Sequence, residues 1–212
     1  MKKLSSYKAW VLDFDGTLYR QPPVQIFMAI WLVVHYFFRP TRLNELFILR
    51  DWRRLREKRF CADEKNFREL QLAELERRYK VPVNAIEKIL RRWLIERPLK
   101  ILRFAVRKKF LVVAKHYQSH GVKMIVYSDN PVREKLSAID FFPDENFCAD
   151  DEFICCMKPD AQGLKNILTT LKLKPDEVLY IGDRDDRDGL CARQAGVDYV
   201  DIKDFEKIEV LP

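Results

Sequence analysis

Three short apolar segments, each ending abruptly in polar residues, constrain the fold of this 212-residue chain more than any other feature. They begin at Ala9 (AWVLDFDGT), Val122 (VKMIVYSDN) and Val178 (VLYIGDRDD). Short runs rich in β-branched and aromatic residues, followed by turn residues, are typical of strands. Because the runs are apolar without alternation, we expect strands that are covered on both faces. The pattern therefore predicts an α/β fold in which helices flank a parallel sheet.

Two weaker runs, NFCAD from Asn146 and VDYVDI from Val197, add candidate outer strands. Helical patterns separate the strands, over Leu99 to His120, about Asp160 to Leu171 and about Gly189 to Ala195. In open parallel sheets, ligands bind at the carboxyl ends of the strands. All three polar clusters lie at such ends, so we expect the functional site there.

The segment from residue 20 to residue 98 differs in character, because it contains no glycine and almost no strand-like alternation. Prolines separate four helical stretches in it, which run from Val24 to Phe38, Thr41 to Arg59, Asp63 to Lys80 and Val83 to Arg97. We interpret residues 20–98 as an inserted all-helical domain and residues 1–19 and 99–212 as one α/β domain. The insert has a net charge of +8 and the remainder −1, so the insert carries the whole positive excess.

The composition excludes several classes of protein. With 48% hydrophobic and 33% charged residues, the chain can bury a core, unlike collagens, disordered tails or disulfide-stapled miniproteins. Its five cysteines are odd in number and form no CxxC pair, which favours reduced thiols. The first residues, MKKLSSYKAWVLDFD, reach two aspartates where a secretory signal needs an apolar run. We therefore expect a cytoplasmic protein.

Asp13 and Asp15 stand two residues apart at the end of the first strand, so their side chains project to the same side. Two carboxylates in one crevice repel each other unless a cation lies between them or one is protonated, which makes the pair a candidate divalent-metal site. A turn with a helix cap is the structural alternative. If the first and third strands are neighbours, Asp183 can complete with them an oxygen ligand set that suits Mg²⁺. A solvated charged loop is the alternative for Asp183.

The second strand ends in groups that could hold an anion. Ser128, Asp129 and Asn130 precede Pro131, the expected first residue of a helix. A hydroxyl with free backbone amides at a helix start forms an oxyanion cradle, although an ordinary helix cap has the same sequence. Lys158, before another such start, could bring positive charge to the same crevice, and a surface lysine is the alternative.

Four motifs, DFDGTL, YSDN, KPDAQGL and IGDRDDRDG, follow one another at these strand ends and together resemble the haloacid dehalogenase (HAD) superfamily of phosphotransferases and hydrolases. The resemblance covers Trp10 to about Ile202, apart from the insert. It implies a HAD-like Rossmannoid core of three αβα layers with a parallel sheet, and it makes the insert a helical cap of the C1 type. The departures are minor: KPDA replaces the KPDP of many relatives, and the DRDDRD loop is unusually charged.

The resemblance also implies roles for the first two aspartates and for the metal site. Asp13 would be the nucleophile that forms an aspartyl-phosphate. Asp15 would protonate the leaving oxygen and then activate water, while its backbone carbonyl binds Mg²⁺. Asp183 would be a metal ligand, and Asp188 would anchor the metal's waters or Lys158.

The remaining implied roles concern the phosphoryl group. Ser128 would bind its oxygens, and the region of Asp129 and Asn130 would support this cradle. Lys158 would neutralise charge on both the nucleophile and the phosphate. Lysine, hydroxyl and Mg²⁺ together stabilise the charge that spreads over phosphoryl oxygens during transfer.

The activity implied is a Mg²⁺-dependent phosphomonoester hydrolase acting on a small phosphorylated metabolite or a lipid-like phosphate. In this family the residue two positions after the nucleophile is aspartate in phosphatases and mutases but not in dehalogenases, so Asp15 argues against carbon–halogen cleavage. A phosphomutase uses the same two aspartates and stays an alternative. A non-catalytic protein, whose basic and aromatic cap binds a membrane or another polyanion, is a second alternative. We expect no specific nucleic-acid partner, because no nucleic-acid module is recognisable.

Two segments of the insert bear on its partner. A basic run surrounds Trp52 and comprises Arg50, Arg53, Arg54, Arg56, Lys58 and Arg59. It would attract a polyanion. A solvated helix face, whose charge Asp51 and Glu57 partly offset, is an equally consistent interpretation. The run from Val24 to Phe38 is apolar all round and shorter than the ~18 residues of a membrane span, which predicts a helix buried on every side. The alternatives are an apolar wall for a lipid-like phosphate and a helix lying on an anionic membrane surface.

Overall fold

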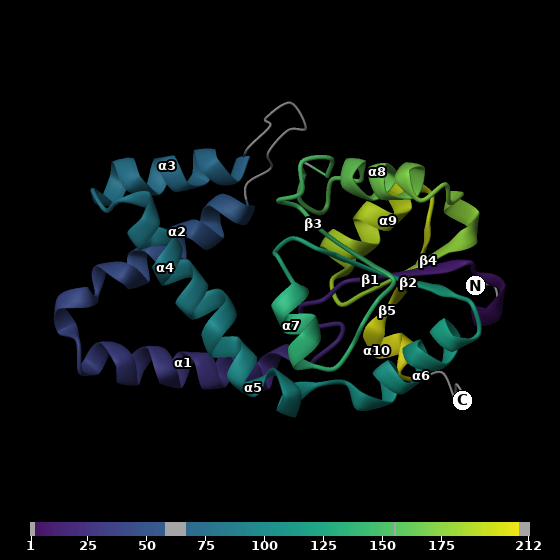
Figure 1. Ribbon diagram of the computed structural model, residues 1–212, viewed down its shortest axis with the longest axis horizontal. Helices are drawn as coiled ribbons and strands as arrows, with labels where there is room; N and C mark the ends of the chain where they lie inside the picture. The colour runs from purple at the N-terminus through teal and green to yellow at the C-terminus, as the bar shows by residue number, and fades with distance from the viewer. Residues whose placement is uncertain (1–2, 58–66, 155, 208–212) are drawn as a thin grey trace.

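Five parallel strands form a single sheet in the order β3-β2-β1-β4-β5 (Figure 1). The computed structural model describes residues 3–57, 67–154 and 156–207. The strands are β1 (Ala9–Leu12), β2 (Lys123–Ser128), β3 (Glu145–Cys148), β4 (Val178–Gly182) and β5 (Asp198–Asp201). The parallel sheet is confirmed, and so are the two strands predicted from the weaker runs.

The register of the sheet brings the polar clusters to one edge. Leu12 of the central strand β1 pairs with Val126 of β2 on one side and with Ile181 of β4 on the other. Asp13 therefore leaves the sheet between the ends of β2 and β4. Ser128 and Asp183 lie at the same edge, because each comes two residues after a partner of Leu12.

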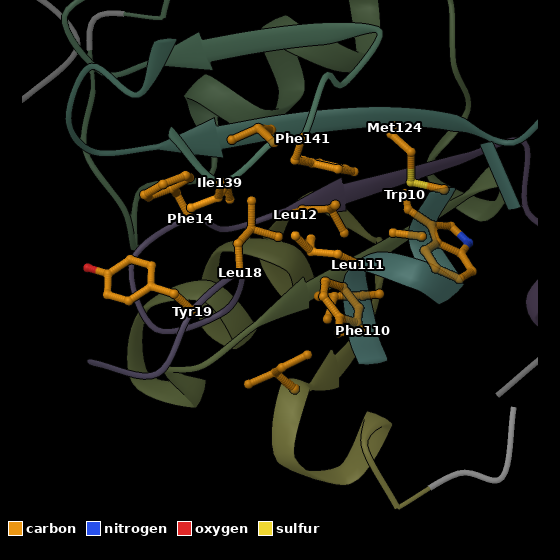
Figure 2. Packing of buried hydrophobic residues seen from close by; sticks show 14 of the residues in the cluster. Trp10, Leu12, Phe14, Leu18, Tyr19, Phe110, Leu111, Met124, Ile139 and Phe141 are labelled. Carbon is orange, nitrogen blue, oxygen red and sulfur yellow. The ribbon is translucent and has the colours of Figure 1, made fainter. Parts of the chain in front are cut away.

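Helices cover both faces of the sheet, as its buried strands require. Trp10 and Leu12 point to one face, where they pack with Phe110 (Figure 2). Phe205 belongs to the same cluster. Ala9 and Val11 point to the other face and pack beneath α8 and α9. The flanking helices are α6 (Lys108–Ser119), α7 (Arg133–Ala138), α8 (Gln162–Thr170), α9 (Leu190–Ala195) and α10 (Ile202–Phe205). The predicted three-layer αβα core is confirmed.

The segment between β1 and α6 forms a separate helical body beside the sheet, which we call the cap (Figure 1). Its helices are α1 (Gln21–Phe37), α2 (Asn44–Glu57), α3 (Phe67–Tyr79), α4 (Val83–Arg91) and α5 (Arg97–Ala105), with one π turn at Arg92–Glu96 between α4 and α5. The cap has its own apolar core, which includes Tyr36, Ile48, Trp52, Leu75, Ile86 and Trp93.

Two adjacent connections join the cap to the sheet. Tyr19 and Val106 form an antiparallel bridge, in which the Arg20 amide donates to the Ala105 carbonyl at 2.8 Å and the Arg107 amide to the Leu18 carbonyl at 3.0 Å. The single helix predicted from Leu99 to His120 is therefore wrong, because the extended backbone at Val106 divides it into α5 and α6. The boundary predicted after residue 98 falls within α5.

Helix α1 is not buried on every side, so that prediction is wrong. Of its side chains only Val24, His35 and Tyr36 are buried. The reason is that α1 packs on the other helices of the cap along one side only. Among the described residues, no single helix is long and apolar enough to cross a membrane. Helix α1 reaches that length and apolarity only together with the segment Pro40–Arg56, from which it is bent by 116°.

The basic run of α2 is largely engaged within the protein. Trp52 is buried in the cap core, and the buried Asp51 pairs with Arg50, Arg54 and Arg78. Arg56 is also buried, where it pairs with Asp150 of the sheet domain at 2.6 Å and donates to the backbone carbonyl of Asp129. Arg56 therefore fastens the cap to the loops after β2 and β3. Lys58 and Arg59 lie outside the described residues.

Candidate active site

Three carboxylates gather at the carboxyl edge of the sheet. Oxygens of Asp13, Asp183 and Asp188 lie within 4.8 Å of one another. Asp13 directly follows β1, Asp183 follows β4, and Asp188 belongs to the turn after it. Close anionic oxygen donors are the set that hard divalent cations such as Mg²⁺ prefer, so these residues fit the implied metal.

Lys158 lies between two of these carboxylates and is itself buried. Its Nζ is 2.5 Å from Asp13 Oδ1 and 2.7 Å from Asp188 Oδ1. Burial lowers the pKa of the Lys158 amine, but the Asp13 and Asp188 carboxylates outweigh it and raise that pKa well above its ordinary value. Lys158 is therefore a permanent cation in contact with the predicted nucleophile.

Acidic neighbours also affect the predicted nucleophile and metal ligand. Burial raises the pKa of the Asp13 carboxyl well above its ordinary value; Lys158 opposes this shift, and Asp188 and Asp183 add to it. Burial and the Asp188 carboxylate raise the pKa of Asp183 to about 6. A bound cation would offset this crowding of negative charge, which further supports a metal at this position.

The close approach of these carboxylates requires two glycines. Gly16 has a φ of +100°, and a Cβ there would collide with the Asp183 carboxylate. At Gly182 a Cβ would lie 2.5 Å from Cβ of Asp188. Both glycines belong to the motifs that carry the aspartates, so these motifs encode the packing of the site as well as its chemistry.

Asp15 stands apart from the three-carboxylate group. Its Oδ1 accepts a hydrogen bond from the Tyr19 hydroxyl at 2.6 Å and lies 3.5 Å from Lys135 Nζ. Its backbone carbonyl, the implied metal ligand, accepts a hydrogen bond from Gln21 Nε2 at 2.8 Å. The cluster of side-chain carboxylates contains Asp13, Asp183 and Asp188 and not the Asp15 carboxylate. The Asp15 backbone carbonyl as a metal ligand stays a prediction.

The last residue of β2 and the residues that follow it lie at the same site. Ser128 is buried, and its Oγ accepts a hydrogen bond from the Asn130 amide at 3.3 Å. The Asp129 carboxylate accepts from the Lys158 amide at 3.0 Å and from Arg187 Nη2 at 2.9 Å. Asp129 therefore holds together the segments that carry Ser128 and Lys158.

Sequence reasoning missed several residues that contact the site, among them Tyr19, Gln21, Lys135 and Arg187. Tyr19 follows Asp15 by four residues, a spacing that could have indicated contact on a turn. Arg187 lies in the charged loop already singled out. Lys135 carries no local signal, because 120 residues separate it from Asp15.

Two cavities meet at these residues. A cavity of about 120 Å³ is lined by Asp13, Ser128, Lys158, Asp183 and Asp188. A larger cavity of about 1090 Å³ extends from it between the cap and the sheet domain. The two share five lining residues, which are Asp15, Gln21, Asp129, Asn130 and Arg187. Pockets that hold drug-sized ligands have volumes of roughly 300–1,000 Å³, so the small cavity suits one reacting group and the large one the rest of a substrate.

The fold and the sequence have known relatives. The structure resembles a 2-haloacid dehalogenase from Pseudomonas syringae pv. Tomato DC3000, with a TM-score of 0.61 and 16% identity over 91% of this chain and 85% of that one. It also resembles a predicted phosphoglycolate phosphatase from Haemophilus somnus 129PT, with a TM-score of 0.54 and 16% identity over 93% and 86%. A HAD phosphatase from Thermococcus onnurineus gives a TM-score of 0.51 and 15% identity over 91% and 84%.

These structural likenesses show a shared fold, and they include both dehalogenases and phosphatases. No curated protein sequence matches the chain. The profile of the haloacid dehalogenase-like hydrolase family matches residues 7–196, which is most of the chain. Together with the four motifs at the edge of the sheet, this match shows that the chain belongs to the haloacid dehalogenase-like hydrolase family.

Proposed function

We propose that this hydrolase is a Mg²⁺-dependent phosphomonoesterase that works through an aspartyl-phosphate on Asp13. The observation that carries the proposal is the surroundings of the Asp13 carboxylate. It contacts a buried lysine and shares a small cavity with Ser128 and two further carboxylates. This combination of a carboxylate nucleophile, fixed cations and a hydroxyl is what phosphoryl transfer needs.

In the first step, an Asp13 carboxylate oxygen attacks phosphorus and the bond from phosphorus to the ester oxygen breaks. The departing oxygen takes a proton from the Asp15 carboxyl, which lies at the junction of the two cavities. Lys158 and the Ser128 hydroxyl offset the negative charge on the phosphoryl oxygens. Tyr19 and Lys135 hold Asp15 Oδ1, so they fix the direction from which the proton is delivered.

In the second step, Asp15 takes a proton from water as that water attacks the phosphorus of the aspartyl-phosphate. The bond between phosphorus and Asp13 breaks, which releases inorganic phosphate and restores the carboxylate. Asp13 and Asp183 would hold the Mg²⁺, with Asp188 as a third ligand or as the acceptor for its waters. When bound, the metal supplies positive charge that stabilises the phosphoryl oxygens.

The position of Asp15 favours phosphate esters over haloacids. A halide leaves without a proton, whereas an alkoxide needs one, so a carboxyl at the mouth of the small cavity helps only the second reaction. The large cavity supports a substrate with a sizeable organic part. Its lining combines apolar residues such as Met28, Leu32 and Trp93 with basic ones such as Arg53 and Arg91, which suits an ester with an apolar group and further polar substituents.

Phosphate release provides the test of this proposal. We expect the purified protein to release phosphate from p-nitrophenyl phosphate and from members of a panel of phosphate esters when Mg²⁺ is present. Removal of the metal with a chelator should abolish turnover, and added Mg²⁺ should restore it. Halide release from 2-haloacids without phosphatase activity would refute the proposal. Phosphate transfer to an acceptor sugar, with no hydrolysis, would instead identify a mutase.

Replacement of Asp15 tests the proton transfer. We expect Asp15→Asn to lower kcat on alkyl phosphates by about 10² to 10⁴, because an alkoxide is a poor leaving group without a proton. The loss on p-nitrophenyl phosphate should be clearly smaller, because nitrophenolate leaves readily. Parallel steady-state kinetics on the two esters measure the difference. Equal losses on both would show that Asp15 does not act as the acid.

A further inference from the structure

One side of helix α1 lines the large cavity, through Gln21, Val24, Gln25, Met28, Ala29 and Leu32. The other side is exposed, and its apolar residues recur at intervals of three or four. We call it the α1 stripe, and it consists of Ile26, Phe27, Ile30, Val33, Val34 and Phe37. Its side chains are between 44% and 77% exposed.

An exposed stripe of this length is unusual for a water-soluble surface. A helix that is apolar all round is ordinarily buried, and contiguous exposed apolar patches mark surfaces that bind a partner. Helix α1 contains no aspartate, glutamate, lysine or arginine, so no charged side chain of its own interrupts the stripe. The exposed Phe38 extends the apolar surface by one residue beyond the helix.

Basic residues of α5 border the stripe. Trp31 connects the two, because its ring lies 5.0 Å from that of Phe27 in the stripe. On the side of α5, Lys100 Nζ lies 5.8 Å and Arg97 Cζ 4.7 Å from the same tryptophan ring. Arg103 follows Lys100 by three residues, as Lys100 follows Arg97, so the three lie along one side of α5. Helix α5 contains no acidic residue, and within the described part of the chain Lys100 and Arg103 are exposed and form no ion pair. No acidic side chain of α5 itself therefore offsets this positive charge.

The length of α1 determines how it can meet a lipid bilayer. Its 17 residues span roughly 25 Å at ~1.5 Å per residue, short of the ~30 Å hydrocarbon core. The chain then turns by 116° into the basic helix α2. A helix of this kind lies in the plane of the interface, with its apolar face in the lipid and its basic neighbours at the headgroups.

We propose that the α1 stripe and the basic residues Arg97, Lys100 and Arg103 of α5 form a docking surface for an anionic lipid bilayer. Charge complementarity selects this occupant. Two copies of the chain meeting through this face about a two-fold axis would bring the same α5 cations into one interface, where they repel. Anionic headgroups attract those cations while the acyl chains cover the stripe. The inference does not depend on the proposed function.

Flotation of the full chain with lipid vesicles tests this surface. We expect it to float with phosphatidylcholine vesicles that contain about 30% phosphatidylglycerol, and far less with pure phosphatidylcholine. The double variant Val33→Gln, Phe37→Gln should lower the bound fraction about tenfold or more, because it removes two of the most exposed stripe residues. The variant Lys100→Gln, Arg103→Gln should lower binding by a similar factor at low salt.

Matched controls distinguish binding through this surface from nonspecific binding by any exposed apolar side chain. Phe142 is 64% exposed on the sheet domain, so Phe142→Gln should leave vesicle binding unchanged. All substituted side chains are exposed, and equal melting temperatures would confirm that the variants fold. The proposal would be overturned if the protein did not float with anionic vesicles at low salt, or if the α1 substitutions left flotation unaffected. It would also be overturned if the protein bound no vesicles but formed a dimer in light scattering that the α1 substitutions dissociated.

Discussion

Asp13→Asn is expected to lower phosphatase kcat/KM by about 10⁴-fold or more, because an amide cannot form the acyl phosphate. The substitution also removes one of the three clustered carboxylates, so the affinity for Mg²⁺ should fall as well. Lys158 keeps Asp188 as an ionic partner at 2.7 Å, and we therefore expect the variant to stay folded. Phosphate release with saturating Mg²⁺ measures the effect.

A control in the same acidic region sharpens this experiment. Asp185 is exposed and pairs with Arg193 at 2.7 Å, and neither residue lines either cavity, so Asp185→Asn should keep the wild-type rate. Acid quenching of the wild-type protein during turnover should trap a phosphoryl adduct, which mass spectrometry can assign to Asp13. An adduct on another residue, or an Asp13→Asn variant with the wild-type rate, would show that Asp13 is not the nucleophile.

Lys158→Met is expected to damage both activity and stability. Loss of the cation that contacts the nucleophile should lower kcat by about 10²- to 10³-fold, the usual effect of removing one group that stabilises transition-state charge. The variant also leaves Asp13 and Asp188 buried without their shared partner. Breaking a buried ion pair in this way costs about 3–5 kcal/mol. At ~2–4 °C per kcal/mol for a chain of this size, Tm should fall by roughly 6–20 °C.

The pH dependence of this loss has a definite sign. A buried carboxyl without a cation has a pKa in the folded state above its pKa in the unfolded state. It therefore destabilises the fold at high pH, and the penalty disappears as the pH falls below the unfolded value. Urea melts at about pH 8 and about pH 5 should show a smaller difference between variant and wild type at the lower pH. Lys165→Met, which replaces an exposed lysine of α8, is the control and should change neither quantity. A variant as stable as wild type at both pH values would contradict the buried ion-pair network.

The sheet and the position of the site could be predicted because their signals are local. Asp13 and Asp183 each follow a continuous apolar run, and parallel strands bring such ends together. The partners of Asp15 could not be predicted in the same way, since Lys135 of α7 lies 120 residues further along the chain and meets it only in the folded structure. Likewise, the motif containing Asp188 does not reveal that its carboxylate joins Asp13 and Asp183.

Two predictions outside the site failed because tertiary contacts overrode the local sequence pattern. The sequence from Leu99 to His120 has helical periodicity throughout, but pairing of Val106 with Tyr19 overrides it. The apolarity of α1 is plain from its residues, whereas burial depends on how many neighbours the fold provides. Only one side of the helix has such neighbours, so local pattern alone predicted the wrong environment.

The paired connections at Tyr19 and Val106 have a consequence for how such an enzyme can change its specificity. Because the two crossing points are held by mutual hydrogen bonds, the intervening 86 residues begin and end at nearly one place. A graft of different length or shape could be spliced between them without moving β1 or α6. New substrate preferences can therefore arise by exchange of the cap alone, while the carboxylate cluster at the edge of the sheet stays unaltered.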